Sequence, residues 1–114
     1  MSLRKAFKKF YNEYTEWFRE KSPTDLAISG LKLAEEAGEV AEAVIAFAGA
    51  SKNKIRKLLR KGQTPRDAVK EELGDVIVVC LNIATLCNIE HDDLFESAAI
   101  KAKRRTEEIR QGVR

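Results

Sequence analysis

The only two prolines of this 114-residue chain stand where its two longest uninterrupted segments begin. Each follows a hydroxyl residue, as Ser22-Pro23 and Thr64-Pro65. A hydroxyl side chain can cap a helix, and proline suits the first helical position because its missing N–H would have no partner there. The sequence therefore predicts two long helices, one from Pro23 to about Ala48 and one from Pro65 to about Asn88. Gly49 can end the first of them.

Three shorter segments also have helical signals. Residues 3–20 interleave aromatic and charged residues at spacings of three and four, which predicts an amphipathic helix. Most of these aromatics should pack in a core, with Trp17 and Phe18 as candidates to stack on a planar ligand. Residues 52–61, after a capping Ser51, are strongly basic, and residues 91–110 form a last helix beginning at His91. The fold class is therefore all-α, with about five helices in a four-helix-bundle-like arrangement.

The run Val76–Leu81 is apolar on every side and rich in β-branched residues, so by propensity alone it could be a buried strand. The apolar pattern continues to Cys87 without a turn, which favours a helix. A helix that is apolar all round needs partners on all sides. We therefore expect an oligomeric bundle core, as a homodimer or a homotetramer.

Length and composition set broad limits. A chain of this size, with 44% hydrophobic and 34% charged residues, is typical of one globular domain, here residues 1–114. No apolar run is long enough to span a membrane, so we expect no membrane partner and a cytoplasmic location. Cys80 and Cys87 are too far apart along one helix for a disulfide, lack the spacing of zinc ligands, and are expected to be small buried residues.

Two acidic clusters carry the functional signal. Glu35, Glu36 and Glu39 lie within the first long segment, and Glu71, Glu72 and Asp75 lie within the second. If the two helices pack side by side, four carboxylates converge, and such hard oxygen ligands suit Mg²⁺ or Mn²⁺. The competing interpretation is a water-facing surface on which Lys32 and Lys70 pair with these acids.

These clusters resemble the E-E-x-x-E and E-x-x-D signature of the MazG-like, all-α nucleoside triphosphate pyrophosphohydrolases. Lys101-Ala102-Lys103-Arg104-Arg105 also resembles the K-x-x-R-R segment of that family, and the resemblance covers roughly residues 26–105. It implies a Mg²⁺-dependent hydrolase that cleaves a nucleoside triphosphate between the α and β phosphates and assembles as a dimer or tetramer. A role in clearing unwanted nucleotides from the pool would fit that activity.

The resemblance also implies roles for individual residues. Glu36, Glu39, Glu72 and Asp75 match the metal ligands and with Glu35 form the predicted catalytic set. Glu35 matches the leading acid, which would hold a further metal or orient the attacking water. Substrate phosphates would be bound by residues that match the basic segment, Lys101 and Arg104. Asn82, two turns beyond Asp75, is added as a substrate-binding candidate from its position alone.

Three other functions remain open. Phosphoribosyl-ATP pyrophosphohydrolase shares the first acidic motif, but Val79-Cys80-Leu81-Asn82 stands where that family has an aromatic-His step. A nucleic-acid-binding helical module would use the basic segment 52–61, although nucleic-acid contact normally needs more than one such segment. A purely structural helical protein ranks last, because it gives no reason to bury two acidic clusters.

Overall fold

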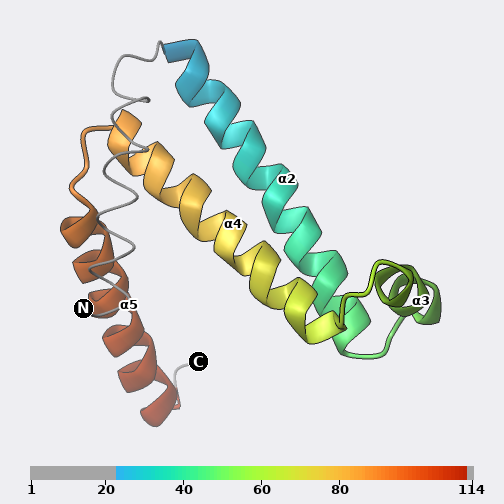
Figure 1. Cartoon of the computed structure of the whole chain (residues 1–114). Coiled ribbons are helices and arrows are strands. Elements are labelled where there is room, and N and C mark those ends of the chain that lie inside the picture. Colours follow the sequence, from blue (N-terminus) through green and yellow to red (C-terminus); the bar gives the residue numbers. More distant parts are fainter. Residues whose placement is uncertain (1–22, 113–114) are drawn as a thin grey trace, which may run out of the picture. The chain divides into compact units, whose positions relative to one another are not determined.

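The computed structural model describes residues 23–112, which contain four helices and no strand (Figure 1). They are α2 (Pro23–Phe47), α3 (Lys52–Arg60), α4 (Pro65–Leu86) and α5 (His91–Arg110). The all-α prediction is confirmed, and the β-branched run Val76–Leu81 lies inside α4. The helix predicted over residues 3–20, with Trp17 and Phe18, lies outside the described residues.

Side-chain caps begin two of these helices as the sequence predicted. The Ser51 hydroxyl accepts a hydrogen bond from the Lys54 N–H at 3.4 Å. The Thr64 hydroxyl accepts one from the Asp67 N–H at 3.2 Å. Each bond satisfies a backbone donor that has no partner within its helix.

Glycines in the left-handed conformation end α2 and α3. Gly49 has φ of 75° and Gly62 has φ of 71°, values that residues with a Cβ rarely adopt. After Gly49, the Ala50 N–H bonds back to the Ile45 carbonyl at 3.1 Å, which satisfies a carbonyl at the helix end. The boundaries of α3 are therefore set by local chemistry on both sides.

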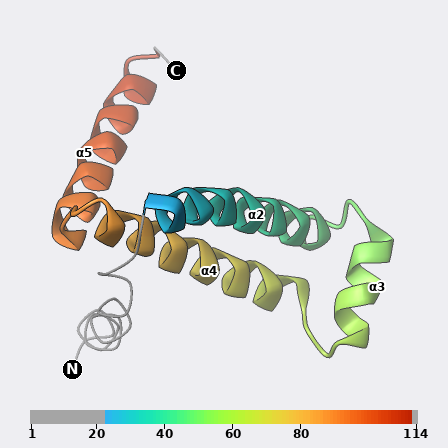
Figure 2. The ribbon, with the colours of Figure 1, turned by 90° about the horizontal axis from the view of Figure 1, so that it is seen from above.

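The described residues fall into two units, 23–83 and 84–112, each considered by itself. In the first unit, α2 and α4 lie side by side and run in opposite directions, and α3 connects them at one end (Figures 1 and 2). The buried apolar side chains of this unit are mostly small: Ala43, Ala46, Ala68, Val79 and Leu81.

Large apolar side chains remain exposed on this unit. Phe47 is 59% exposed, Leu73 is 47% exposed and Ile77 is 51% exposed. With Val69 and the stems of two basic side chains, they line a depression of about 400 Å³. The residues predicted to be apolar on all sides of α4 thus divide between a buried set, such as Leu81, and an exposed set, such as Ile77.

The second unit contains the end of α4 and all of α5. Asn88 takes the left-handed conformation after α4, with φ of 58°, and the His91 Nε2 lies 3.0 Å from the Thr85 hydroxyl. Cys80 is half-buried and Cys87, which follows the end of α4, is exposed, so the expectation that both cysteines are buried was wrong for Cys87. Among the described helices, none is by itself long and apolar enough to cross a membrane; α4 and α5 meet that test only as a bent pair.

Candidate metal centre

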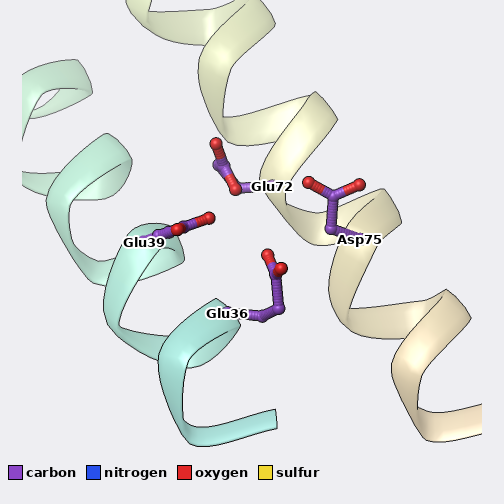
Figure 3. A group of neighbouring side chains, drawn as sticks. All are labelled: Glu36, Glu39, Glu72 and Asp75. Atoms are coloured by element: carbon purple, nitrogen blue, oxygen red, sulfur yellow. The ribbon is translucent and has the colours of Figure 1, made fainter. Parts of the chain in front are cut away.

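Four carboxylates from α2 and α4 point toward one another (Figure 3). Glu36 and Glu39 are three residues apart on α2, and Glu72 and Asp75 are three apart on α4, so each pair shares one face of its helix. One carboxylate oxygen from each residue lies within 4.8 Å of the other three. The structure thus brings together the four residues that were predicted to bind a metal.

Two oxygens of this cluster are buried without a hydrogen-bond partner, the Oε2 atoms of Glu36 and Glu72. Glu36 is only 6% exposed, whereas Asp75 lies at the exposed side of the cluster. A buried acceptor without a partner costs roughly 1–3 kcal/mol, and more when it is charged. These atoms are therefore poorly satisfied by the protein alone.

Glu72 shows the consequence of gathering the acids. Burial, followed by the hydrogen bond and the charge of Glu39 and the charges of Asp75 and Glu36, raises the pKa of Glu72 from 4.5 to about 7. Burial is the larger cause, and repulsion adds to it, since two carboxylates 4 Å apart repel by roughly 4 kcal/mol at an effective dielectric constant of about 20. The negative charge of the cluster is thus not fully neutralised by nearby positive groups.

Lys32 supplies some of that charge on the α2 side. Its Nζ lies 3.0 Å from the Glu36 Oε1 and 3.6 Å from the Glu35 Oε2. Hydrogen bonding to Glu36, then the charges of Glu35 and Glu36, raise the pKa of Lys32. The surface pairing considered from sequence therefore exists for Lys32, but it satisfies only one oxygen of Glu36.

The cluster fits a hard divalent cation. All four donors are carboxylates, the ligands preferred by Mg²⁺ and Mn²⁺, and no histidine or cysteine takes part. One oxygen of each residue lies within 4.8 Å of the others, so Glu36, Glu39, Glu72 and Asp75 would hold such a cation between α2 and α4. A cation would also satisfy the two unpartnered Oε2 atoms.

The leading acids of both motifs lie outside this cluster. Glu35 is exposed and pairs with Lys32, and Glu71 is exposed and accepts a 2.7 Å hydrogen bond from the Gln63 side chain. Neither belongs to the group of four. If Glu35 takes part in the reaction, it therefore acts from the rim of the site.

Of the remaining predicted residues, one shares α4 with two of the carboxylates and two lie on α5, in the other unit. Asn82 is buried on α4, seven residues or about 10 Å along the helix from Asp75. Lys101 and Arg104 are exposed on α5, in the other unit, where the Arg104 Nε lies 3.8 Å from Glu108 Oε1. Their predicted contact with substrate phosphates stays a prediction.

A cavity of about 410 Å³ adjoins the carboxylates on the side of α3. Glu39 and Glu72 form part of its wall, and α3 contributes Lys54, Lys57 and, at its end, Lys61. The sequence marked residues 52–61 as basic but favoured a solvated face. Their spacing of three, then four, already placed these lysines on one side of the helix, whereas their position beside the acids depends on how α3 folds back.

Comparison with known proteins gives one match. Residues 28–109 match the sequence model of the MazG nucleotide pyrophosphohydrolase domain. Comparisons with curated proteins and with solved structures give no significant match. The matched range includes both acidic motifs and most of the described chain.

Proposed function

We propose, given that the chain belongs to the MazG nucleotide pyrophosphohydrolase family, that it is a Mg²⁺-dependent nucleoside triphosphate pyrophosphohydrolase. Its substrate would be a ribo- or deoxyribonucleoside triphosphate, and its products the monophosphate and pyrophosphate. The observation that carries the proposal is the convergence of four carboxylates, two of them with a buried oxygen that has no partner.

The reaction is a hydrolysis at the α phosphorus. The oxygen of a water molecule forms a bond to that phosphorus, and the bond to the bridging oxygen of the β phosphate breaks. The bonding electrons leave with pyrophosphate, and the water loses a proton. No residue of the protein needs to form a covalent intermediate.

The acids provide position and charge for this step. Glu36, Glu39, Glu72 and Asp75 would hold the cation, which, when bound, polarises the phosphate and lowers the pKa of a coordinated water. At neutral pH Glu72 must first release the proton that its raised pKa retains. Glu35, at the rim, would orient the attacking water or hold a further ion, and Lys101 and Arg104 would contact phosphates.

We also propose that the protein acts as a homo-oligomer. The apolar depression around Phe47, Leu73 and Ile77 supports this, since exposed apolar patches on a small protein commonly mark association surfaces. Ile77→Glu should shift the mass measured by analytical ultracentrifugation to that of a monomer. An unchanged mass in this variant would place the association surface elsewhere.

The proposed activity can be tested with a panel of nucleotides. Purified protein is incubated with canonical and modified nucleoside triphosphates, with and without Mg²⁺, and both products are measured. Release of monophosphate and pyrophosphate in equal amounts, only with the metal, is expected. Preferred turnover of phosphoribosyl-ATP would support the alternative enzyme, and salt-sensitive DNA binding without nucleotide turnover would support a nucleic-acid-binding module.

A control variant should preserve the fold while removing the chemistry. Glu39→Gln and Asp75→Asn keep the shape of the side chain but remove a negative ligand. Both should lose Mg²⁺-dependent pyrophosphate release while their circular dichroism spectra remain helical. Full activity in both variants would reject the assignment of these acids.

A further inference from the structure

The basic helix α3 forms one wall of a cavity whose other walls include two of the candidate metal ligands. The cavity, of about 410 Å³, is large enough for part of a nucleotide, since ligand pockets commonly measure about 300–1,000 Å³. Glu39 and Glu72 border it from α2 and α4, and Lys54, Lys57 and Lys61 border it from α3 and its end. Carboxylates and lysines therefore line the same cavity.

The three lysines differ in their partners. Lys54 Nζ lies 3.7 Å from Glu42 Oε1, an ion pair between α3 and α2. Among the described residues, Lys57 and Lys61 form no ion pair. Among the described residues that border the cavity, the only other acid is Glu42. Once Glu39 and Glu72 bind a cation, the lysines therefore leave this lining positively charged.

We propose that Lys57 and Lys61 bind the β and γ phosphates of the substrate, the part that leaves as pyrophosphate. The inference rests on the proposed function and adds an anion site to it. Ammonium groups at this position would stabilise the charge that collects on pyrophosphate as the bond to the α phosphorus breaks. They would act from α3, separately from the basic residues of α5.

The lining favours phosphate over a nucleobase. No aromatic side chain is among the described residues that border the cavity, so none there could stack on a base. In the described part of the chain, the apolar residues that line it are alanines and Leu58, and the polar ones are charged except for Gln63. A highly charged oligophosphate matches such walls better than a planar ring does.

The same helix provides a matched control. Arg56 and Arg60 are exposed on α3, four residues apart like Lys57 and Lys61, and neither borders the cavity. Lys57→Gln/Lys61→Gln and Arg56→Gln/Arg60→Gln therefore remove equal charge from the same helix on two different sides. Only the first pair should affect an anion held in the cavity.

The experiment titrates inorganic pyrophosphate into the full chain at saturating Mg²⁺ and follows the heat of binding. The lysine pair should raise the Kd at least about tenfold, because charge-assisted hydrogen bonds are lost, and the arginine pair should change it by less than about twofold. A Mg²⁺ titration without pyrophosphate should be the same in both variants, and Lys57→Arg should retain binding.

Three results would overturn the inference. They are a wild-type protein that does not bind pyrophosphate, equal losses in the two double variants, and a lysine variant that instead loses binding of an unphosphorylated nucleoside. Nucleotide hydrolysis is measured in parallel. Active wild-type protein with normal pyrophosphate binding in the lysine variant rejects only the anion site, whereas absence of hydrolysis by the wild type rejects the proposed function.

Discussion

The two acidic motifs place similar residues in the site but balance their charge differently. On α2, the carboxylate of Glu36 has a lysine four residues earlier, and Lys32 forms a 3.0 Å ion pair with it. On α4, the residue four before Glu72 is Ala68, which is buried and cannot supply a charge. Glu72 retains a proton instead, with its pKa raised to about 7. Lys32 thus offsets negative charge on α2, and a bound proton offsets it on α4.

The difference shows how a cation would enter the cluster. It would compete with a permanent positive charge at Glu36 and with a removable one at Glu72. The charge of Lys32 is therefore constant near neutral pH, because its pKa is raised above its usual value, whereas the protonation of Glu72, with a pKa of about 7, changes there. Variants that remove the charge of Glu72, Glu36 or Lys32 test this comparison directly.

The largest effect is expected from removing the carboxylate charge on α4. Glu72→Gln should lower Mg²⁺-dependent hydrolysis by at least about 100-fold. Removal of a residue that only hydrogen-bonds to a metal ligand already lowers activity by up to about 100-fold, and removal of the ligand itself should lower it at least as much. At pH 8 without metal, this variant should unfold at a higher urea concentration than the wild type, since the amide avoids the repulsion. Glu36→Gln should lose activity equally but gain no such stability, because Lys32 already compensates Glu36.

The pH dependence should follow Glu72. Between about pH 4.5 and 7 the folded protein without metal keeps a proton that the unfolded chain has released, so stability from this group falls as pH rises. Mg²⁺ binding should respond oppositely, weakening about tenfold per pH unit below pH 7 because the proton must leave. Urea unfolding and Mg²⁺ titration from pH 5 to 8 measure both, and identical pH slopes in Glu72→Gln would show that another group is responsible.

A smaller effect is expected from the leading acids. Glu35→Gln should lower turnover by about tenfold with the affinity for Mg²⁺ unchanged, as expected for an acid that orients water from the rim. Glu71→Gln is the matched control, and its turnover should stay within about twofold. Initial rates at saturating Mg²⁺ measure both, and equal rates in the two variants would remove Glu35 from the catalytic set.

The smallest effect should come from the lysine that balances α2. Lys32→Met removes a cation that competes with the metal, so Mg²⁺ should bind a few-fold more tightly, as expected for a partly exposed ion pair. Lys70→Met removes a lysine from α4 that has no ion pair among the described residues, and should leave the affinity unchanged. Weaker Mg²⁺ binding by Lys32→Met would mean that Lys32 helps to organise the site.

The sequence was sufficient for the four described helices and for the composition of the cluster. Thr64, Ser51 and the glycines act locally, so their effect on helix boundaries could be predicted without tertiary information. The three-residue spacing likewise places Glu36 with Glu39, and Glu72 with Asp75. Side-by-side packing of the two helices was a hypothesis made from the convergence of the four carboxylates.

Features that depend on packing could not be predicted in this way. The burial of Glu36 compared with the exposure of Asp75 follows from how α2 and α4 approach each other. The position of Lys57 and Lys61 depends on the direction in which α3 leaves α2.

Gly49 and Gly62 bound the segment that connects the two acidic motifs. Because each motif lies within its own long helix, residues between these glycines can change in length or charge while the four carboxylates keep their spacing. Substrate phosphates and the metal would then be bound by different segments of the chain, which could change independently in evolution. The connection from α2 to α4 is accordingly where affinity for the oligophosphate could be altered, by selection or by design, with the metal ligands left in place.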